Sequence, residues 1–150
     1  MEIREGIKYL SGSGKKVCIS KIDKNNVEVY FDDNKSKIVG GNINSLLKNF
    51  KDELFKLIHY PYKVGDWVYD INDEYTKSHN TPKITQITNI KGEDSYARYF
   101  VNNEESGVTE QYFQLEYRPC FDHEIPGNNI KERKESMSYL IKFLKKRGII

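Results

Sequence analysis

Cysteine is scarce in this sequence, and long apolar runs are missing from it. Only Cys18 and Cys120 are present, which is too few for the disulfide framework of a small secreted domain. No apolar run approaches the roughly 18 residues that cross a bilayer, and residues 1–5 carry charges where a signal peptide needs an apolar segment. We therefore expect a cytoplasmic protein that does not contact membranes, with both thiols reduced and structural.

Net charge is small as well. The sequence has 24 Lys and Arg against 22 Asp and Glu, a balance of +2. A chain so close to neutral does not bind nucleic acid over its whole surface, so any such binding would need a local basic patch. Hydrophobic residues make up 37% of the 150 residues and aromatics 13%, enough for a folded core and against global disorder. This length fits one domain or two very small ones.

The first 44 residues predict a small β unit. β-branched and alternating apolar residues favour strands, and clusters of Gly, Asn and Asp favour the turns between them. We expect residues 11–14 and 23–26 to be turns, and Gly40-Gly41 to end the last strand. The expected strands are residues 3–10, 16–22, 27–31 and 36–39.

Residues 45–60 predict an amphipathic helix that links this unit to a second one. Asn44 or Ser45 could accept hydrogen bonds from the first turn, and Pro61 disfavours helical geometry in the residue before it. Apolar residues recur at helical spacing and define one face. They are Leu46, Leu47, Phe50, Leu54, Leu57 and Ile58.

The remaining sequence predicts a second β unit over residues 61–118 and a loop with a C-terminal helix over residues 119–150. We expect a long polar loop at residues 72–82 and turns at 91–94 and 102–107. Expected strands in the second unit are residues 62–69, 83–90, 95–101 and 108–117. The C-terminal helix is expected to be capped by Asn128 or Asn129 and to carry the apolar stripe Ile130, Met137, Leu140, Ile141 and Leu144.

The two β units resemble each other in the order and spacing of their residues. Residues 4–9 align with residues 63–68, and the spacing Ile19-x-x-Ile22 aligns with Ile87-x-x-Ile90. Three further alignments are expected: residues 23–26 with 91–94, residues 29–31 with 98–100, and Gly40-Gly41 before Leu46-Leu47 with Gly107 before Tyr112-Phe113. The second copy has the longer first loop. The alternative is that any two antiparallel meanders share such a pattern.

The segment Val64-Gly65-Asp66-Trp67-Val68 resembles the opening strand of Tudor- or KOW-like small β-barrels. The resemblance extends over residues 63–116 and weakly over residues 3–47, where Ile7 stands in place of the acid. It implies a non-catalytic fold that binds proteins or nucleic acids. The expected fold class is thus α+β and mainly β, with two barrel-like units.

Catalytic and metal-binding patterns are incomplete. Cys120 and His123 form one pair of metal-capable residues, whereas a tetrahedral zinc site needs four ligands. Nucleophilic catalysis by the same pair would also need an orienting acid, and the Pro126-Gly127 loop that follows it has no oxyanion-hole signature. Residues 12–15 lack the upstream glycine of a phosphate-binding loop. We therefore expect no enzyme, no metal and no cofactor.

Two groups of residues are candidates for binding. An aromatic face for a protein partner could be formed by Trp67, Tyr69, Tyr96, Tyr99, Tyr112 and Tyr117, although strands bury alternate residues and part of this set could be core. The favoured binding residues in this set are Trp67, Tyr69, Tyr99 and Tyr112. Lys142, Lys145, Lys146 and Arg147 could contact phosphates, although cations in a last helical turn also stabilise the helix dipole.

Our first hypothesis is a protein-interaction module that binds a protein or nucleoprotein complex. Its small size, mixed surface charge and abundant tyrosine favour this function. Alanine occurs only at position 97, which is typical of an AT-rich gene and suggests a phage or mobile-element inhibitor of a host defence complex. The alternative is a nucleic-acid-binding module that uses the basic C-terminal helix.

Overall fold

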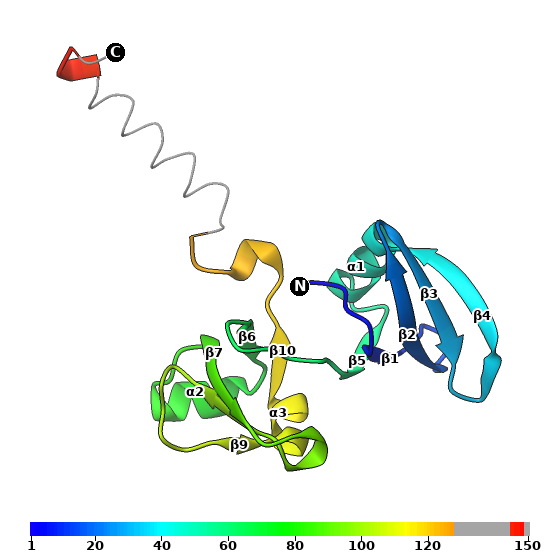
Figure 1. Ribbon diagram of the computed structural model, residues 1–150. Helices are drawn as coiled ribbons and strands as arrows, with labels where there is room; N and C mark the ends of the chain where they lie inside the picture. Colours follow the sequence, from blue (N-terminus) through cyan, green and yellow to red (C-terminus); the bar gives the residue numbers. More distant parts are fainter. Residues whose placement is uncertain (128–144, 149–150) are drawn as a thin grey trace.

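The protein is mainly β-structure, arranged as two curled antiparallel sheets of five strands each. The computed structural model describes residues 1–127 and 145–148. Figure 1 shows the two sheets as separate lobes, and the chain after strand β10 (Tyr117–Pro119) runs back toward the lobe that holds the N-terminus. The predicted fold class, mainly β with two small barrel-like units, is confirmed.

The first sheet has the strand order β4-β3-β2-β1-β5, so four strands form a meander and the fifth returns to pair with the first. Alternate residues of β2 and β3 point inward, and Val17, Ile19, Val27 and Val29 are buried there. The strands are β1 (Lys8–Leu10), β2 (Lys16–Asp23), β3 (Asn26–Phe31), β4 (Asn34–Asn42) and β5 (Lys56–His59).

Gly40 and Gly41 continue β4 instead of ending it. They pair with Glu28 and Val27 of β3, and a Cβ on Gly41 would lie 3.3 Å from the Val27 side chain. Glycine in a strand often marks such a close approach. The prediction that the strand ends at Val39 was wrong. Pairing with β3 keeps Gly40 and Gly41 in the strand although glycine is a weak β-former.

Helix α1 (Ile43–Lys51) begins one residue after its N-cap, Asn42. The Asn42 side chain accepts hydrogen bonds from the backbone N–H groups of Asn44 and Ser45. The predicted caps are therefore donors within the first turn, and the cap itself lies two or three residues earlier.

The predicted linking helix over residues 45–60 was wrong beyond Lys51. Phe55 stacks on Tyr9 with ring centroids 4.8 Å apart, and Leu57 pairs with Tyr9 in the ladder between β1 and β5. The apolar residues of α1 and those of the following strand β5 together fit a helical spacing, although they belong to two different elements of the first unit. The two units are connected by residues 60–66 instead.

The second sheet has the strand order β10-β6-β7-β8-β9. Val68 and Ile87 are fully buried at its centre. The strands are β6 (Trp67–Asp70), β7 (Ile84–Lys91), β8 (Arg98–Val101), β9 (Val108–Thr109) and β10 (Tyr117–Pro119).

Three segments of the second unit differ from the sequence prediction. The polar loop expected at residues 72–82 contains helix α2 (Asp73–His79), capped by Asn72. The strand expected at 108–117 is divided into β9, helix α3 (Glu110–Glu116) and β10. Part of the strand expected at 95–101 forms the short helix η1 (Asp94–Tyr96). Phe113 belongs to the apolar pattern that suggested a strand, and it is buried as a residue of α3.

The two units repeat the same backbone pairing. The N–H of Gly6 donates to Ile19 O at 2.9 Å, and the N–H of Gly65 donates to Ile87 O at 2.8 Å. Both glycines have positive φ, 92° and 95°. The alignment of residues 4–9 with residues 63–68 is therefore reproduced by hydrogen bonds at equivalent positions.

A bulge also occurs at the same place in each unit. The register shifts between Ile19 and Lys21 in the β2–β3 pair and between Ile87 and Asn89 in the β7–β8 pair. The bulged residues themselves behave alike. Ser20 Oγ donates to Glu28 O at 3.1 Å, and Thr88 Oγ1 donates to Phe100 O at 3.2 Å.

The register corrects two details of the predicted alignment. Residues 26–29 of β3 are equivalent to residues 98–101 of β8, because Ile19 pairs with Val29 while Ile87 pairs with Val101. The alignment of 29–31 with 98–100 was thus displaced by three residues. By the same register Gly40 is equivalent to Gly107, and Leu46 is equivalent to Phe113 rather than to Tyr112.

The expected C-terminal helix lies mostly at residues 128–144, outside the described residues, and so does its predicted apolar stripe. None of the described helices is long and apolar enough to span a membrane.

A candidate binding groove between the two units

The four aromatic residues predicted to bind a partner do not form one exposed face. Tyr99 is 7% exposed and stacks on Phe113, with ring centroids 4.6 Å apart. Its inclusion as a surface residue was wrong, since it lies on the inward face of β8. Tyr112 is 69% exposed on α3.

Trp67 and Tyr69 are half-buried on the outward face of β6, because Val68 and Asp70 point inward. The Arg118 guanidinium lies 4.3 Å from the Tyr69 ring centroid. The Tyr69 ring is therefore covered by Arg118 of β10 and is not free to contact a partner.

The predicted basic residues are described only in part. Lys142 lies outside the described residues. Lys145, Lys146 and Arg147 are exposed.

The chemistry of Cys120 does not favour nucleophilic catalysis. Its side chain is buried, and that burial raises the pKa of the thiol to about 11. Little thiolate would exist at neutral pH, whereas a cysteine nucleophile needs a lowered pKa. Within the described residues, no group of three or more His, Cys, Asp or Glu side chains is placed to hold a metal ion.

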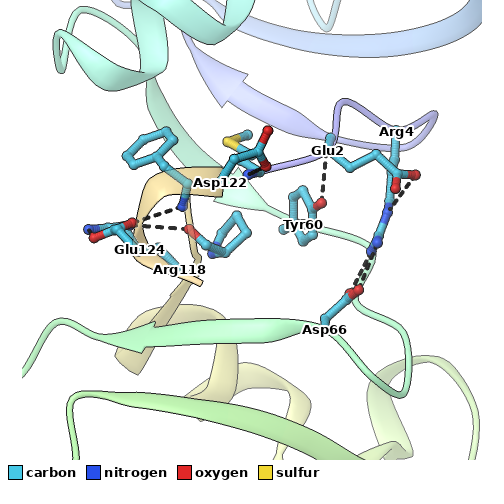
Figure 2. Close-up of polar contacts among 10 residues, drawn as sticks. Glu2, Arg4, Tyr60, Asp66, Arg118, Asp122 and Glu124 are labelled. Carbon is cyan, nitrogen blue, oxygen red and sulfur yellow. Dashed lines mark hydrogen bonds and ion pairs between the residues drawn. The ribbon is translucent and has the colours of Figure 1, made fainter. Parts of the chain in front are cut away.

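The junction between the units is fixed by polar contacts from several elements (Figure 2). Arg4 Nη1 and Nη2 donate to the two carboxylate oxygens of Asp66 at 2.6 and 2.7 Å. Arg4 also donates to Pro61 O at 3.0 Å and lies over the Tyr60 ring. Tyr60 Oη donates to Glu2 O at 2.8 Å. The acid of the barrel-like motif thus joins the second unit to the first.

Buried aromatic residues of the connecting segment support the same junction. Tyr60 and Tyr62 are almost fully buried, with ring centroids 4.9 Å apart. The Gln114 side chain accepts from the Tyr60 N–H at 2.9 Å and donates to Tyr60 O at 2.8 Å. Tyr62 Oη donates to Tyr117 O at 3.2 Å. The connection is therefore packed into the core instead of extending through solvent.

A second set of contacts holds the chain that follows β10 (Figure 2). Arg118 forms a bidentate ion pair with Glu124, with both N–O distances 2.8 Å. Glu124 also accepts the Phe121 N–H at 2.8 Å. Burial opposes ionisation of Glu124, but the hydrogen bonds from Arg118 and Phe121, together with the nearby positive charge, outweigh it and lower the pKa of this carboxyl. Asp122 contacts the Met1 amino group at 3.3 Å.

These contacts border a groove of about 430 Å³ between the two units. Its lining comes from the end of α1, the chain into β5, the N-terminus, β10 and the residues around it, and it is mostly apolar. The apolar lining residues are Met1, Phe50, Phe55, Leu57, Ile71, Tyr117, Pro119 and Phe121, and the polar ones are Lys51, Glu53, Lys56, Gln114 and Arg118.

None of the four favoured aromatic residues lines this groove, but Tyr117, from the wider predicted set, does. Phe50 and Leu57 carried only a helical signal in the sequence, and Phe121 carried none. Residues 50–57 and residues 114–121 of the lining are more than fifty residues apart in the chain, so the groove depends on the junction contacts of Arg4 and Gln114. No periodic pattern in the sequence could therefore have predicted this groove.

Comparison with known proteins finds no matching family model, no matching curated protein and no matching solved structure. The resemblance of residues 63–116 to Tudor- and KOW-like barrels therefore stays a prediction from the sequence.

Proposed function

We propose that this protein is a non-catalytic protein-interaction module that binds an apolar segment of a partner in the groove between its two units. The observation that carries the proposal is the groove itself, about 430 Å³ in volume and lined mainly by apolar side chains from both units. Concave, mostly apolar surfaces with a few polar groups are the usual form of binding sites.

The groove is held in shape before any partner arrives. Arg4, Gln114 and Arg118 fix its walls with hydrogen bonds of 2.6 to 3.0 Å. A preorganised site loses less conformational entropy on binding, so more of the contact free energy appears as affinity. This supports a binding function that needs no rearrangement of the two units.

Exposed apolar side chains extend the groove at its margins. Ile71 lines it and is 51% exposed, and Leu54, which is 59% exposed, lies between the lining residues Glu53 and Phe55. Exposed apolar surface next to a concave site is typical of protein contacts. The finer hypothesis, that the partner is a host defence complex, stays a prediction.

The test is selection of peptides from a random display library on the folded protein, followed by affinity measurement on two variants. Ile71→Glu places a charge in the groove, while Ile38→Glu makes the same change on β4, where Ile38 is 61% exposed. We expect selected peptides to bind Ile71→Glu about tenfold or more weakly, because a carboxylate would be desolvated there. Binding to Ile38→Glu should be unchanged.

Unfolding curves of both variants control for folding, since each replaced side chain is half-exposed or more and its loss should alter stability little. Peptides that bind all three proteins equally would remove the groove from consideration. Failure to select any peptide that Ile71→Glu weakens would contradict the proposed function.

A further inference from the structure

We infer that the segment bound in this groove carries a carboxylate next to its apolar anchor. The inference rests on the proposed function and names the chemistry of the partner. It follows from which polar groups of the groove already have partners in the folded protein and which do not.

Two polar side chains of the groove are already satisfied. Arg118 is neutralised by its bidentate pair with Glu124 and also donates to Pro119 O at 3.2 Å. The Gln114 amide is occupied on both sides by the backbone of Tyr60. Neither group is available to a ligand without breaking a contact that holds the groove in shape.

The Met1 amino group of the lining is paired with Asp122 at 3.3 Å, and the remaining charges of the lining are two lysines and one glutamate. Lys51 ends α1, Lys56 begins β5, and both side chains are exposed. Neither forms an ion pair within the described residues, and Lys51 Nζ lies 5.8 Å from the Phe121 ring centroid. Glu53 is also exposed and forms no ion pair within residues 1–127 and 145–148. The lining therefore presents an excess of one positive charge.

A carboxylate matches this excess, whereas a basic segment would place like charges together. Charge complementarity of this kind selects partners more than it adds affinity. An Asp or Glu side chain and a free C-terminal carboxylate offer the same chemistry, so the two sources must be separated by experiment.

The experiment compares three display libraries of equal length, each with apolar central positions. Their flanking positions are restricted to Asp and Glu, to Asn and Gln, or to Lys and Arg. We expect groove-dependent binders, defined here by weakening on the uncharged variant Ile71→Gln, to come mainly from the acidic library. The best binder is then made with an amidated and with a free C-terminus, and with its acids replaced by amides, to assign the carboxylate.

A double variant tests the lysines directly. Lys51→Gln with Lys56→Gln should weaken an acidic peptide about three- to tenfold, the range for two exposed ion pairs, and should reduce its salt dependence. The matched control is Lys21→Gln with Lys35→Gln, which removes the same charge from exposed positions of β2 and β4. The control should leave affinity unchanged at moderate salt.

The outcomes separate the two proposals. Groove-dependent binders with no acidic preference, or equal effects of the two double variants, would overturn the carboxylate inference and leave the binding function standing. Absence of groove-dependent binders from all three libraries would overturn both.

Discussion

His59 is a titratable residue that lies between the two units, at the end of β5. Its Nδ1 is 3.5 Å from Glu110 Oε1 on α3, and its cross-strand partner is Lys8. Burial lowers the pKa of His59; Glu110 opposes this shift and Lys8 adds to it. The folded protein therefore favours the neutral imidazole more than the unfolded chain does.

This shift predicts a pH dependence of stability. The contribution is present above the unfolded pKa of about 6.5 and is lost as the pH falls, because the unfolded state then binds the proton more readily. Between about pH 7.5 and about pH 5.5, the wild type should lose more free energy of unfolding than His59→Gln. Urea titrations followed by the fluorescence of Trp67 would measure both.

His79→Gln on α2 is the matched control, because it removes an exposed imidazole away from the junction. Parallel profiles for the wild type and His59→Gln would show that His59 is not the group responsible.

At the scale of single elements, the sequence predicted what depends on local pattern. Alternation predicted the strands that became β2 and β3, and Val17, Ile19, Val27 and Val29 of these strands are buried. It could not separate α1 from β5, because Phe50 and Leu57 both face one core and their spacing suits a helix. That boundary is set by pairing with Tyr9, a contact across almost fifty residues.

The structural repeat allows one glycine to serve as the control for another. Gly107 faces Phe100, and a Cβ on Gly107 would lie 2.8 Å from the Phe100 ring. Gly40, at the equivalent position beside Glu28, has no heavy atom within 4 Å of such a Cβ. Neither glycine has positive φ, so the two sites differ in available space and not in backbone strain.

Gly107→Ala should therefore lower the free energy of unfolding by about 1–3 kcal/mol, the usual cost of overpacking. Gly40→Ala should be neutral or stabilise by about 0.5 kcal/mol, because alanine restricts the unfolded chain. Chemical denaturation of both variants measures the difference. Equal effects would mean that the Phe100 ring moves aside at little cost.

At the scale of the whole molecule, the junction decides whether a groove exists. Its walls come from the N-terminus, residues 50–57, Ile71 and residues 114–121. The sequence indicated two units but not their contact, because Arg4 and Asp66 are isolated charges in the sequence. The motif residue Asp66 suggested a barrel strand. Its ion pair between the units depends on Arg4, which lies sixty-two residues away in the sequence.

The Arg4–Asp66 pair should couple the stabilities of the two units. Both side chains are mostly buried, at 12% and 17% exposed, and removing one partner leaves the other charge without compensation. Arg4→Ala or Asp66→Asn should each cost about 2–3 kcal/mol, somewhat less than a fully buried pair. The double variant should cost much less than the sum of the two, because neither charge remains unpaired.

Glu2→Gln is the matched control for this pair, because Glu2 contacts Arg4 Nε at 3.3 Å but is 69% exposed. Its effect should be below about 0.5 kcal/mol, as for other exposed ion pairs. Urea unfolding of the four variants gives the coupling free energy directly. Strictly additive single effects would contradict a bridge between the units. A lowered slope of the transition in Arg4→Ala, with two separable steps, would instead show that this bridge makes the two units unfold together.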